Sequence, residues 1–201
     1  NQIGVPLTIF SVSNDDDYLI VEIGTNHFGE VRYSSEIAQP DYALITNIGP
    51  SHLEFLKNLS GVKKEKIALF EIANKNKGII FLNVDDKLLR PLKNKYKKVI
   101  AYSLNSSSKD KEIDVKGEIL EYDKNGKAKI KFYYKRKSFE IISPIFGEHN
   151  AKNILAAVAV GLKLDLSIEE IKTGIEKLKA VKQRFDVKRF NDILLIDDTY
   201  N

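Results

Sequence analysis

Residues that could bind a metal ion or a phosphate gather at a few positions, each within or just after an apolar run. Glu22 lies within such a run, and Asn26 and His27 follow it. In parallel sheets, ligands bind outside the carboxyl ends of the strands. Side chains at these ends therefore predict a ligand site that is built from several short loops. The other polar residues at such positions are Asn47, Ser51, His52, Glu54, Asp197 and Asp198.

Each of these residues also has a simpler structural explanation when it is considered alone. A carboxylate such as Glu22 is costly to bury unless it is paired or binds a metal, and a salt bridge to a lysine would suffice. His52 fits an ordinary loop histidine, Lys66 a lysine on a helix surface, and Asp198 a turn residue. Only the order and the local contexts of these residues point to shared chemistry.

The elements that must position these residues alternate between strands and helices. Apolar runs predict strands at residues 18–24, 42–48, 78–83 and 99–102. Apolar residues at helical spacing predict helices at residues 29–39 and 60–74, the second with Ser60 as its N-cap. This alternation is typical of an α/β fold with a mostly parallel sheet flanked by helices.

The pattern changes in the second half of the chain. Residues 113–143 contain three strand-like runs, and Asn125-Gly126 between the first two is a strong hairpin signal. We therefore expect a small three-stranded antiparallel subsheet. Helices are expected at residues 149–164 and 168–179, with Ser167 and Glu170 as a capping box for the second. Residues 193–196 predict a last buried strand that delivers Asp197 and Asp198.

Composition excludes several functional classes. Of the 201 residues, 43% are apolar and 30% are charged, as in ordinary globular proteins. No stretch reaches the roughly 18 apolar residues of a membrane span, and no secretion signal opens the chain. The lack of cysteine excludes disulfides and thiolate metal sites and fits a cytoplasmic location. The net charge of +4 comes from lysine runs, which we interpret as solvated surface because no nucleic-acid-binding motif accompanies them.

Five motifs together resemble the Mur ligases, and within them the type that adds D-alanyl-D-alanine. They span nearly the whole chain in the order found in that family. The motifs are Asn1-Gln-Ile-Gly-Val-Pro-Leu-Thr8, Val21-Glu-Ile-Gly-Thr-Asn-His-Phe-Gly-Glu30, Ala43-Leu-Ile-Thr-Asn-Ile-Gly-Pro-Ser-His-Leu-Glu54, Gly147-Glu-His-Asn-Ala-Lys-Asn153 and Ile196-Asp-Asp-Thr-Tyr-Asn201.

This resemblance implies a P-loop-like central domain of a three-domain cytoplasmic enzyme of peptidoglycan synthesis. Such a ligase uses ATP to phosphorylate the terminal carboxylate of a UDP-N-acetylmuramoyl-tripeptide. The amine of D-alanyl-D-alanine then attacks the acyl phosphate. A carboxylate is a poor electrophile, and the charge that develops on the phosphate needs cations. The implied cofactors are therefore ATP and two Mg²⁺ ions.

The resemblance also implies roles for individual residues. Glu22 resembles a Mg²⁺ ligand, and His52 resembles a ligand of the second Mg²⁺. Lys66 falls where the family carries a carbamylated lysine, whose oxygens suit Mg²⁺, although Lys63 and Lys64 lie nearby and Ile67 and Ala68 stand where Gly and Glu are usual. The remaining roles concern the nucleotide and the substrate: Asn150 and Asn153 at the adenine, Arg184 at the γ-phosphate, Asp198 near the ribose, and Asn26 and His27 at the nucleotide-sugar.

The phosphate-binding loop of the family is absent from this sequence. The only Gly-Lys pair, Gly126-Lys127, is followed by Ala128 rather than Thr or Ser. We expect residues 1–201 to be the central domain without this loop and its strand, and without the domains before and after it. Alone, the chain should then be inactive. An unpaired sheet edge also invites pairing with another chain, so we expect self-association.

Two alternatives stay open at this point. The chain could belong to another Mur-like ligase that adds an amino acid or polyglutamate to a different carboxylate. It could also be a non-catalytic module that binds nucleotides or nucleic acid, as its lysines suggest. Strongly salt-dependent binding of DNA or RNA would favour the second alternative.

Overall fold

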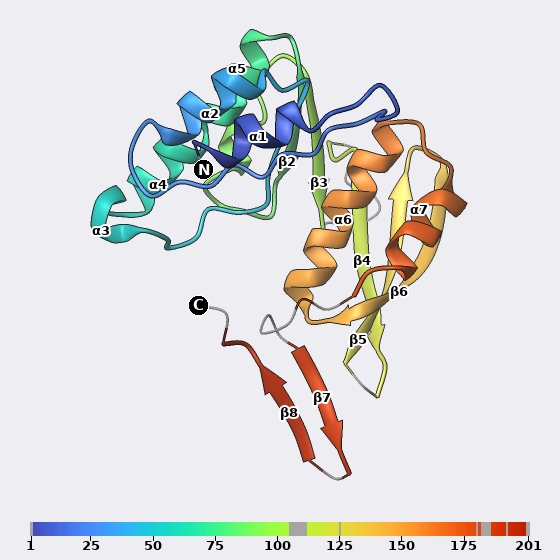
Figure 1. Cartoon of the computed structure of the whole chain (residues 1–201). Helices are drawn as coiled ribbons and strands as arrows, with labels where there is room; N and C mark the ends of the chain where they lie inside the picture. The colour runs from blue at the N-terminus through green and yellow to red at the C-terminus, as the bar shows by residue number, and fades with distance from the viewer. Residues whose placement is uncertain are drawn as a thin grey trace. The chain divides into compact units, whose positions relative to one another are not determined.

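The computed structural model describes residues 2–104, 112–124, 126–179, 181, 186–191 and 193–199. The chain divides into two compact units, Asn1–Ile100 and Ala101–Asn201, whose elements are shown in Figure 1. The elements of the first unit are α1 Gly4–Phe10, α2 Glu30–Ala38, β1 Tyr42–Ile45, α3 Leu53–Leu56, α4 Leu59–Lys66, α5 Ala68–Lys75, β2 Ile79–Asn83 and the 3₁₀ helix η1 Arg90–Leu92. Strand β3, Val99–Ser103, crosses the boundary, and the second unit continues with β4 Val115–Tyr122, β5 Lys127–Tyr134, β6 Lys137–Phe146, α6 Glu148–Lys163, α7 Ile168–Glu176, β7 Asp186–Phe190 and β8 Ile193–Asp197.

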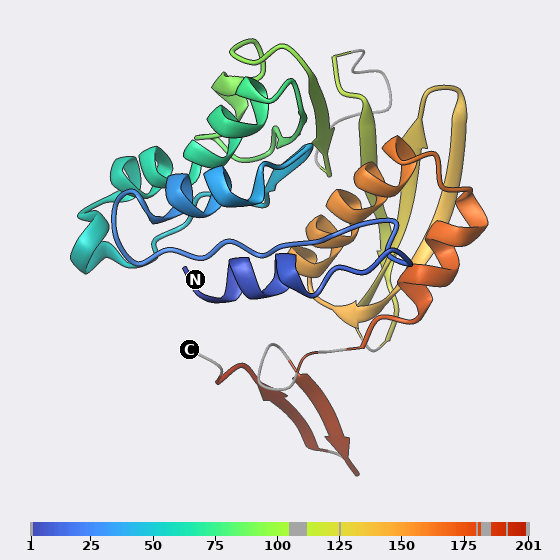
Figure 2. The ribbon, with the colours of Figure 1, turned by 45° about the horizontal axis from the view of Figure 1, so that its top comes forward.

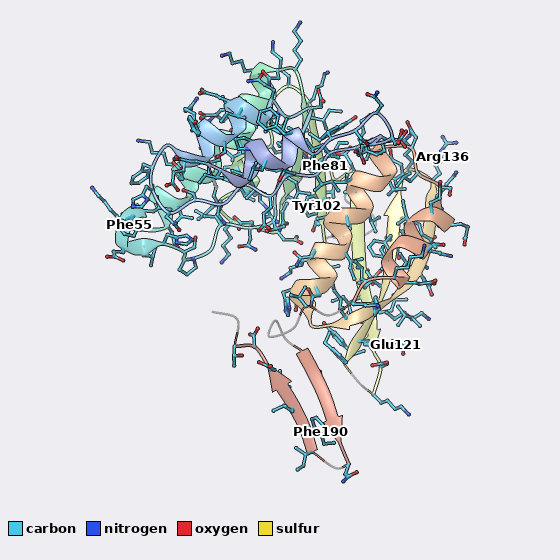
Figure 3. All side chains as sticks on the ribbon, in the orientation of Figure 1. Phe55, Phe81, Tyr102, Glu121, Arg136 and Phe190 are labelled. Carbon is cyan, nitrogen blue, oxygen red and sulfur yellow. The ribbon has the colours of Figure 1, made fainter. Side chains whose placement is uncertain are left out.

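The first unit is built on the parallel pair β1 and β2. Tyr42 lies opposite Ile79, and Ile45 lies opposite Leu82. Helix α5 packs against both strands, α2 packs against α5, and α1 packs against α2. The β2 residue Phe81, labelled in Figure 3, is fully buried, as a continuous apolar run in a parallel strand predicts.

The second unit is built on the antiparallel strands β4, β5 and β6. Buried and partly exposed residues alternate along β5, so that Ala128, Ile130 and Phe132 face the core. Helix α6 packs against all three strands and α7 packs against β6 (Figure 2). Ser167 caps α7 through the expected reciprocal bonds with Glu170.

The expected fold class is confirmed. Six strands form a mixed sheet in the order β1-β2-β3-β4-β5-β6, with helices packed against it. The pairs β1–β2 and β3–β4 are parallel, whereas β4, β5 and β6 form the predicted antiparallel part. The predicted hairpin joins β4 to β5, with Gly126 at a φ of 81°, while Asn125 lies outside the described residues. None of the helices in the described part is long and apolar enough to cross a membrane.

The prediction of a buried strand at residues 18–24 is wrong. This segment has no regular secondary structure, and Tyr18, Leu19 and Ile20 are exposed, Ile20 to 90%. An extended segment becomes a stable strand only when its backbone groups pair with a neighbour. No strand among the described residues pairs with this one, so the apolar run alone does not make it a strand.

The single helix predicted at residues 60–74 is two helices, α4 and α5. The chain turns at Ile67, whose ψ of −12° departs from the helical value of about −42°. The N-cap of α4 is Asn58 rather than Ser60, because the Asn58 side chain accepts a hydrogen bond from Gly61 N at 3.0 Å.

The last predicted strand exists as β8, but it is not buried. It pairs with β7 in a separate two-stranded sheet. Ile193, Leu195 and Ile196 are 68%, 47% and 50% exposed. A two-stranded hairpin offers no second layer of its own to cover its apolar side chains, which explains the exposure.

Candidate functional site

The loop before α2 carries Asn26 and His27 and is closed by Glu30. Glu30 Oε2 accepts hydrogen bonds from the backbone nitrogens of Asn26 at 2.6 Å and His27 at 3.1 Å. These two bonds lower the pKa of Glu30 to about 2. Gly29, at a φ of 94°, is the N-cap of α2, where a side chain would be strained.

A second carboxylate, that of Glu65, holds the same loop from α4. Its Oε2 accepts a hydrogen bond from Gly29 N at 2.7 Å, and its Oε1 accepts one from Val31 N at 2.8 Å. Thr25 Oγ1 lies 3.3 Å from Oε1. Only 4% of Glu65 is exposed. A buried carboxylate is costly without partners, and here the start of α2 supplies them.

Lys66, the next residue, reaches the loop after β1. Its Nζ donates a hydrogen bond to the carbonyl oxygen of Asn47 at 3.3 Å. Partial burial lowers the pKa of the Lys66 amine, and the nearby carboxylate of Asp86 partly offsets that effect. Asp86 Oδ2 in turn accepts a hydrogen bond from Ile48 N at 2.7 Å. Lys66 and Asp86 therefore both contact residues 47–48.

The same loop ends in His52, which is held in the left-handed region at a φ of 49°. This conformation is uncommon for a residue with a side chain. The carbonyl of His52 accepts hydrogen bonds from Phe55 N and Leu56 N, which begins α3. The Ser51 hydroxyl beside it is buried and has no hydrogen-bond partner among the described residues. Such a hydroxyl costs about 1–3 kcal/mol unless a ligand or water satisfies it.

The loop before α2 and the loop after β1 line one surface hollow of about 490 Å³. Asn26 and Glu30 line it from the loop before α2, and His52 lines it from the loop after β1. The ring of His27 packs on Phe55, labelled in Figure 3, with centroids 4.2 Å apart. The remaining lining residues are Gln2, Ile3, Gly24, Thr25 and Ser34.

Glu22, another predicted site residue of the first unit, lies in solvent. Glu22 is exposed and forms no hydrogen bond or ion pair with a described residue. Within the described ranges, no group of three or more His, Asp and Glu side chains could hold a metal ion. The structure thus brings Asn26 and His52 to one hollow, holds Lys66 against the loop that leads to His52, and leaves Glu22 in solvent.

The second unit carries the residues predicted at the nucleotide. Asn150 and Asn153 lie three residues apart on α6 and therefore on one face of it. Asn150 Nδ2 donates to the carbonyl of Phe146 at 2.7 Å, which fixes its orientation, while Asn153 is exposed. Asp198 is exposed just after β8. Arg184 lies outside the described residues.

The sequence pattern of the Mur ligase middle domain matches residues 1–161. The chain belongs to the Mur ligase family. Two relatives named UDP-N-acetylmuramoyl-tripeptide–D-alanyl-D-alanine ligase, from Haemophilus influenzae and Escherichia coli K12, are each 32% identical to it over its full length. The match spans 42% and 44% of those relatives, so the chain is less than half as long as they are.

Solved structures agree with this family assignment. A crystal structure of MurF from Acinetobacter baumannii matches with a TM-score of 0.86 and 29% identity. That match covers 99% of this chain and 42% of the other. A second Acinetobacter baumannii structure, described as a UDP-N-acetylmuramoylalanyl-D-glutamyl-2,6-diaminopimelate–D-alanyl-D-alanyl ligase, matches with a TM-score of 0.80 and 28% identity over 99% of this chain and 42% of the other.

Three carboxylates of this Mur ligase domain were not among the predicted site residues. Asp86 follows β2. The expectation that ligands bind at the carboxyl ends of parallel strands would therefore have found it. Glu30 stands directly after Gly29 at the start of a helix, where acidic residues are favoured. Glu65 gave no signal, because in sequence it is one charged residue in a lysine-rich helix.

Proposed function

We propose that this chain is the central, ATP-binding domain of a ligase that joins D-alanyl-D-alanine to a UDP-N-acetylmuramoyl-tripeptide through an acyl phosphate. The observation that carries the proposal is the match to two relatives with that activity over the full length of this chain. The hollow between Asn26 and His52 supports it, because it lies beside loops that offer amide, imidazole and carboxylate groups.

We propose that side chains of the first unit contribute some of the ligands of two Mg²⁺ ions, since no group of three or more described His, Asp and Glu side chains could hold an ion by itself. We assign Glu22 to one ion, and His52 and a carbamylated Lys66 to the other. Mg²⁺ usually takes one or two protein carboxylates together with substrate phosphates, so the phosphates of ATP would supply further ligands. When bound, Mg²⁺ neutralises charge on the phosphoryl group that is transferred. The unsatisfied Ser51 hydroxyl beside His52 would meet a ligand or water there.

The surroundings of Lys66 support its carbamylation. Carbon dioxide reacts with the neutral amine, and partial burial lowers the pKa of this amine. The hydrogen bond to the Asn47 carbonyl fixes Nζ against the loop that ends at His52. A carbamate would replace one positive charge by one negative charge at this point. It would also supply two oxygen ligands.

The nucleotide would be bound by residues of the second half of the chain. Asn150 and Asn153 would contact the adenine from one face of α6, and the bond to Phe146 keeps the Asn150 amide in place. Arg184 would reach the γ-phosphate and Asp198 the ribose. Asn26 and His27 would contact the nucleotide-sugar substrate, and His52 and Arg184 would stabilise the phosphate charge during transfer.

The test uses the longer protein, expressed from its own gene. Phosphate release should require ATP, Mg²⁺, UDP-N-acetylmuramoyl-tripeptide and D-alanyl-D-alanine together. Turnover with an amino acid or a glutamate-containing acceptor instead would identify a different Mur-like ligase. No turnover with any acceptor, combined with salt-dependent binding of DNA or RNA, would replace the proposal by a binding role.

The 201-residue chain itself should show no magnesium-dependent ATP turnover. Its sequence has no Gly-Lys-Thr or Gly-Lys-Ser motif to bind the phosphates. We place the chain between a substrate domain and an amine-binding domain, in a cytoplasmic enzyme.

We also propose that the isolated chain self-associates through β1, because β2 is the only strand that pairs with β1 among the described residues. A monomer at all concentrations in analytical ultracentrifugation would refute self-association.

A further inference from the structure

We propose that Glu65 is a positioning residue that sets the affinity of the loop at residues 24–30 for the carboxylate substrate. The proposal rests on the proposed function, because Asn26 and His27 lie on this loop. The structure gives Glu65 a specific task, since its carboxylate connects the last turn of α4 to the start of α2.

The contacts of Glu65 are those of a carboxylate that fixes backbone. It accepts hydrogen bonds from Gly29 N and Val31 N at 2.7 and 2.8 Å, and only 4% of the residue is exposed. The donors are the N-cap Gly29 and the first-turn residue Val31 of α2, where backbone N–H groups lack partners within the helix. The negative charge also lies at the positive end of the helix dipole. Thr25, within 3.3 Å of Oε1, donates to the carbonyl of His27 at 2.9 Å.

A neutral side chain of the same size cannot make these contacts. In Glu65→Gln, one carboxylate oxygen becomes an NH₂ group, which would face the N–H of Gly29 or of Val31. Two donors would then meet, and one buried N–H would lose its acceptor, which is costly. The loop at residues 24–30 would keep its bonds to Glu30 but would lose one of the two backbone bonds to residue 65.

Glu65 also connects this loop to the proposed metal-binding side of the site. Consecutive side chains on a helix point about 100° apart. Glu65 therefore reaches Gly29 at the end of the loop before α2, while Lys66 reaches Asn47 in the loop after β1. The last turn of α4 thus fixes both loops that line the hollow. This arrangement separates the two roles, since Glu65 should affect the substrate and Lys66 the metal.

The test compares Glu65→Gln with Glu71→Gln in the longer protein. Glu71 also binds α2, through Arg32 at 2.6 Å, but on the surface and through a side chain. In Glu65→Gln, the KM for UDP-N-acetylmuramoyl-tripeptide should rise about tenfold, while the KM for ATP should stay within about twofold. Glu71→Gln should change neither value, because surface ion pairs contribute little.

Hydrogen exchange gives a readout that does not depend on activity. The amides of Gly29 and Val31 should exchange at least about tenfold faster in Glu65→Gln than in the wild type and in Glu71→Gln. If the wild type shows no ligase activity, the proposed function fails, but this exchange comparison still tests the positioning role. Unchanged exchange, or equal KM changes for both substrates, would overturn the proposal. If Glu65→Gln does not fold, Glu65→Asp replaces it, and failure of both to fold would overturn a local role.

Discussion

Glu30 Oε2 lies 2.6 Å from the backbone nitrogen of Asn26, four residues earlier in the chain. The same oxygen accepts a hydrogen bond from His27 N at 3.1 Å. The side chain of the first residue of α2 thus folds back over the loop that precedes the helix. Both donors keep their hydrogen atoms at all ordinary pH values, so the contact depends only on the charge of Glu30.

Acid should therefore weaken this loop through Glu30. Its pKa is lowered to about 2 in the folded chain, from 4.5. A lowered pKa stabilises the fold at pH values above 4.5, and that stabilisation is lost as the pH falls towards 2. Because Glu30 lies near the surface, we expect a loss of only about 1 kcal/mol. Urea unfolding at several pH values should show a steeper acid dependence for the wild type than for Glu30→Gln, and identical slopes would contradict this.

The sequence predicted those elements whose signal is local. The run at residues 78–83 became the buried strand β2, and Ser167 with Glu170 formed the capping box of α7. The runs at residues 18–24 and 193–196 also predicted buried strands, yet Leu19 and Ile20 in the first and Ile193, Leu195 and Ile196 in the second are exposed. Strand burial depends on partners elsewhere in the chain, and an apolar run does not specify them.

In the candidate site, too, the sequence predicted residues from their local position but not residues whose role depends on contacts with distant elements. The expectation that ligand-binding residues follow strands led to Asn26 and His52, which line one hollow, although no strand precedes Asn26 in the structure. It could not lead to Glu65, because the acceptor role of Glu65 exists only where α4 packs beside α2. A residue that supports a loop from another element has no sequence spacing that reveals it.

The N-cap of α4 offers a direct comparison between the predicted and the observed residue. Asn58 accepts a hydrogen bond from Gly61 N at 3.0 Å, whereas Ser60 lies exposed inside the helix. Asn58→Ala should lower the free energy of unfolding by about 1 kcal/mol, since it removes a cap. Ser60→Ala should be neutral to within about 0.5 kcal/mol. Thermal unfolding of both variants tests this, and a larger effect at Ser60 would speak against the observed cap.

Ser35 on α2 should be a site where stability can be gained. It is completely buried, and its hydroxyl has no partner among the described residues. Removing an unsatisfied buried hydroxyl avoids its desolvation cost, and alanine is also the better helix former. Ser35→Ala should therefore raise the free energy of unfolding by about 1 kcal/mol. A loss of stability in denaturant unfolding would mean that the hydroxyl is satisfied after all.

Lys66 allows a test that also separates it from its neighbours. Arginine keeps the positive charge but does not form a stable carbamate, so Lys66→Arg in the longer protein should lower kcat by about a hundredfold or more. Lys63 and Lys64 lie in the same helix, and Lys64 is exposed, with its Nζ 6.0 Å from the Phe28 ring centroid. Lys63→Arg and Lys64→Arg should therefore keep nearly full activity, because arginine preserves the positive charge at both positions.

The chemical state of Lys66 can be observed independently of turnover. With ¹³C-labelled bicarbonate, the wild type should show a carbamate carbon signal in NMR that Lys66→Arg lacks and that both control variants keep. The signal is expected because partial burial lowers the pKa of this amine and so leaves more of it neutral and able to react. A carbamate signal that disappears in Lys63→Arg or Lys64→Arg, together with an active Lys66→Arg, would move the metal-binding role to that neighbour. It would also mean that the bond between Lys66 and the Asn47 carbonyl only supports the loop.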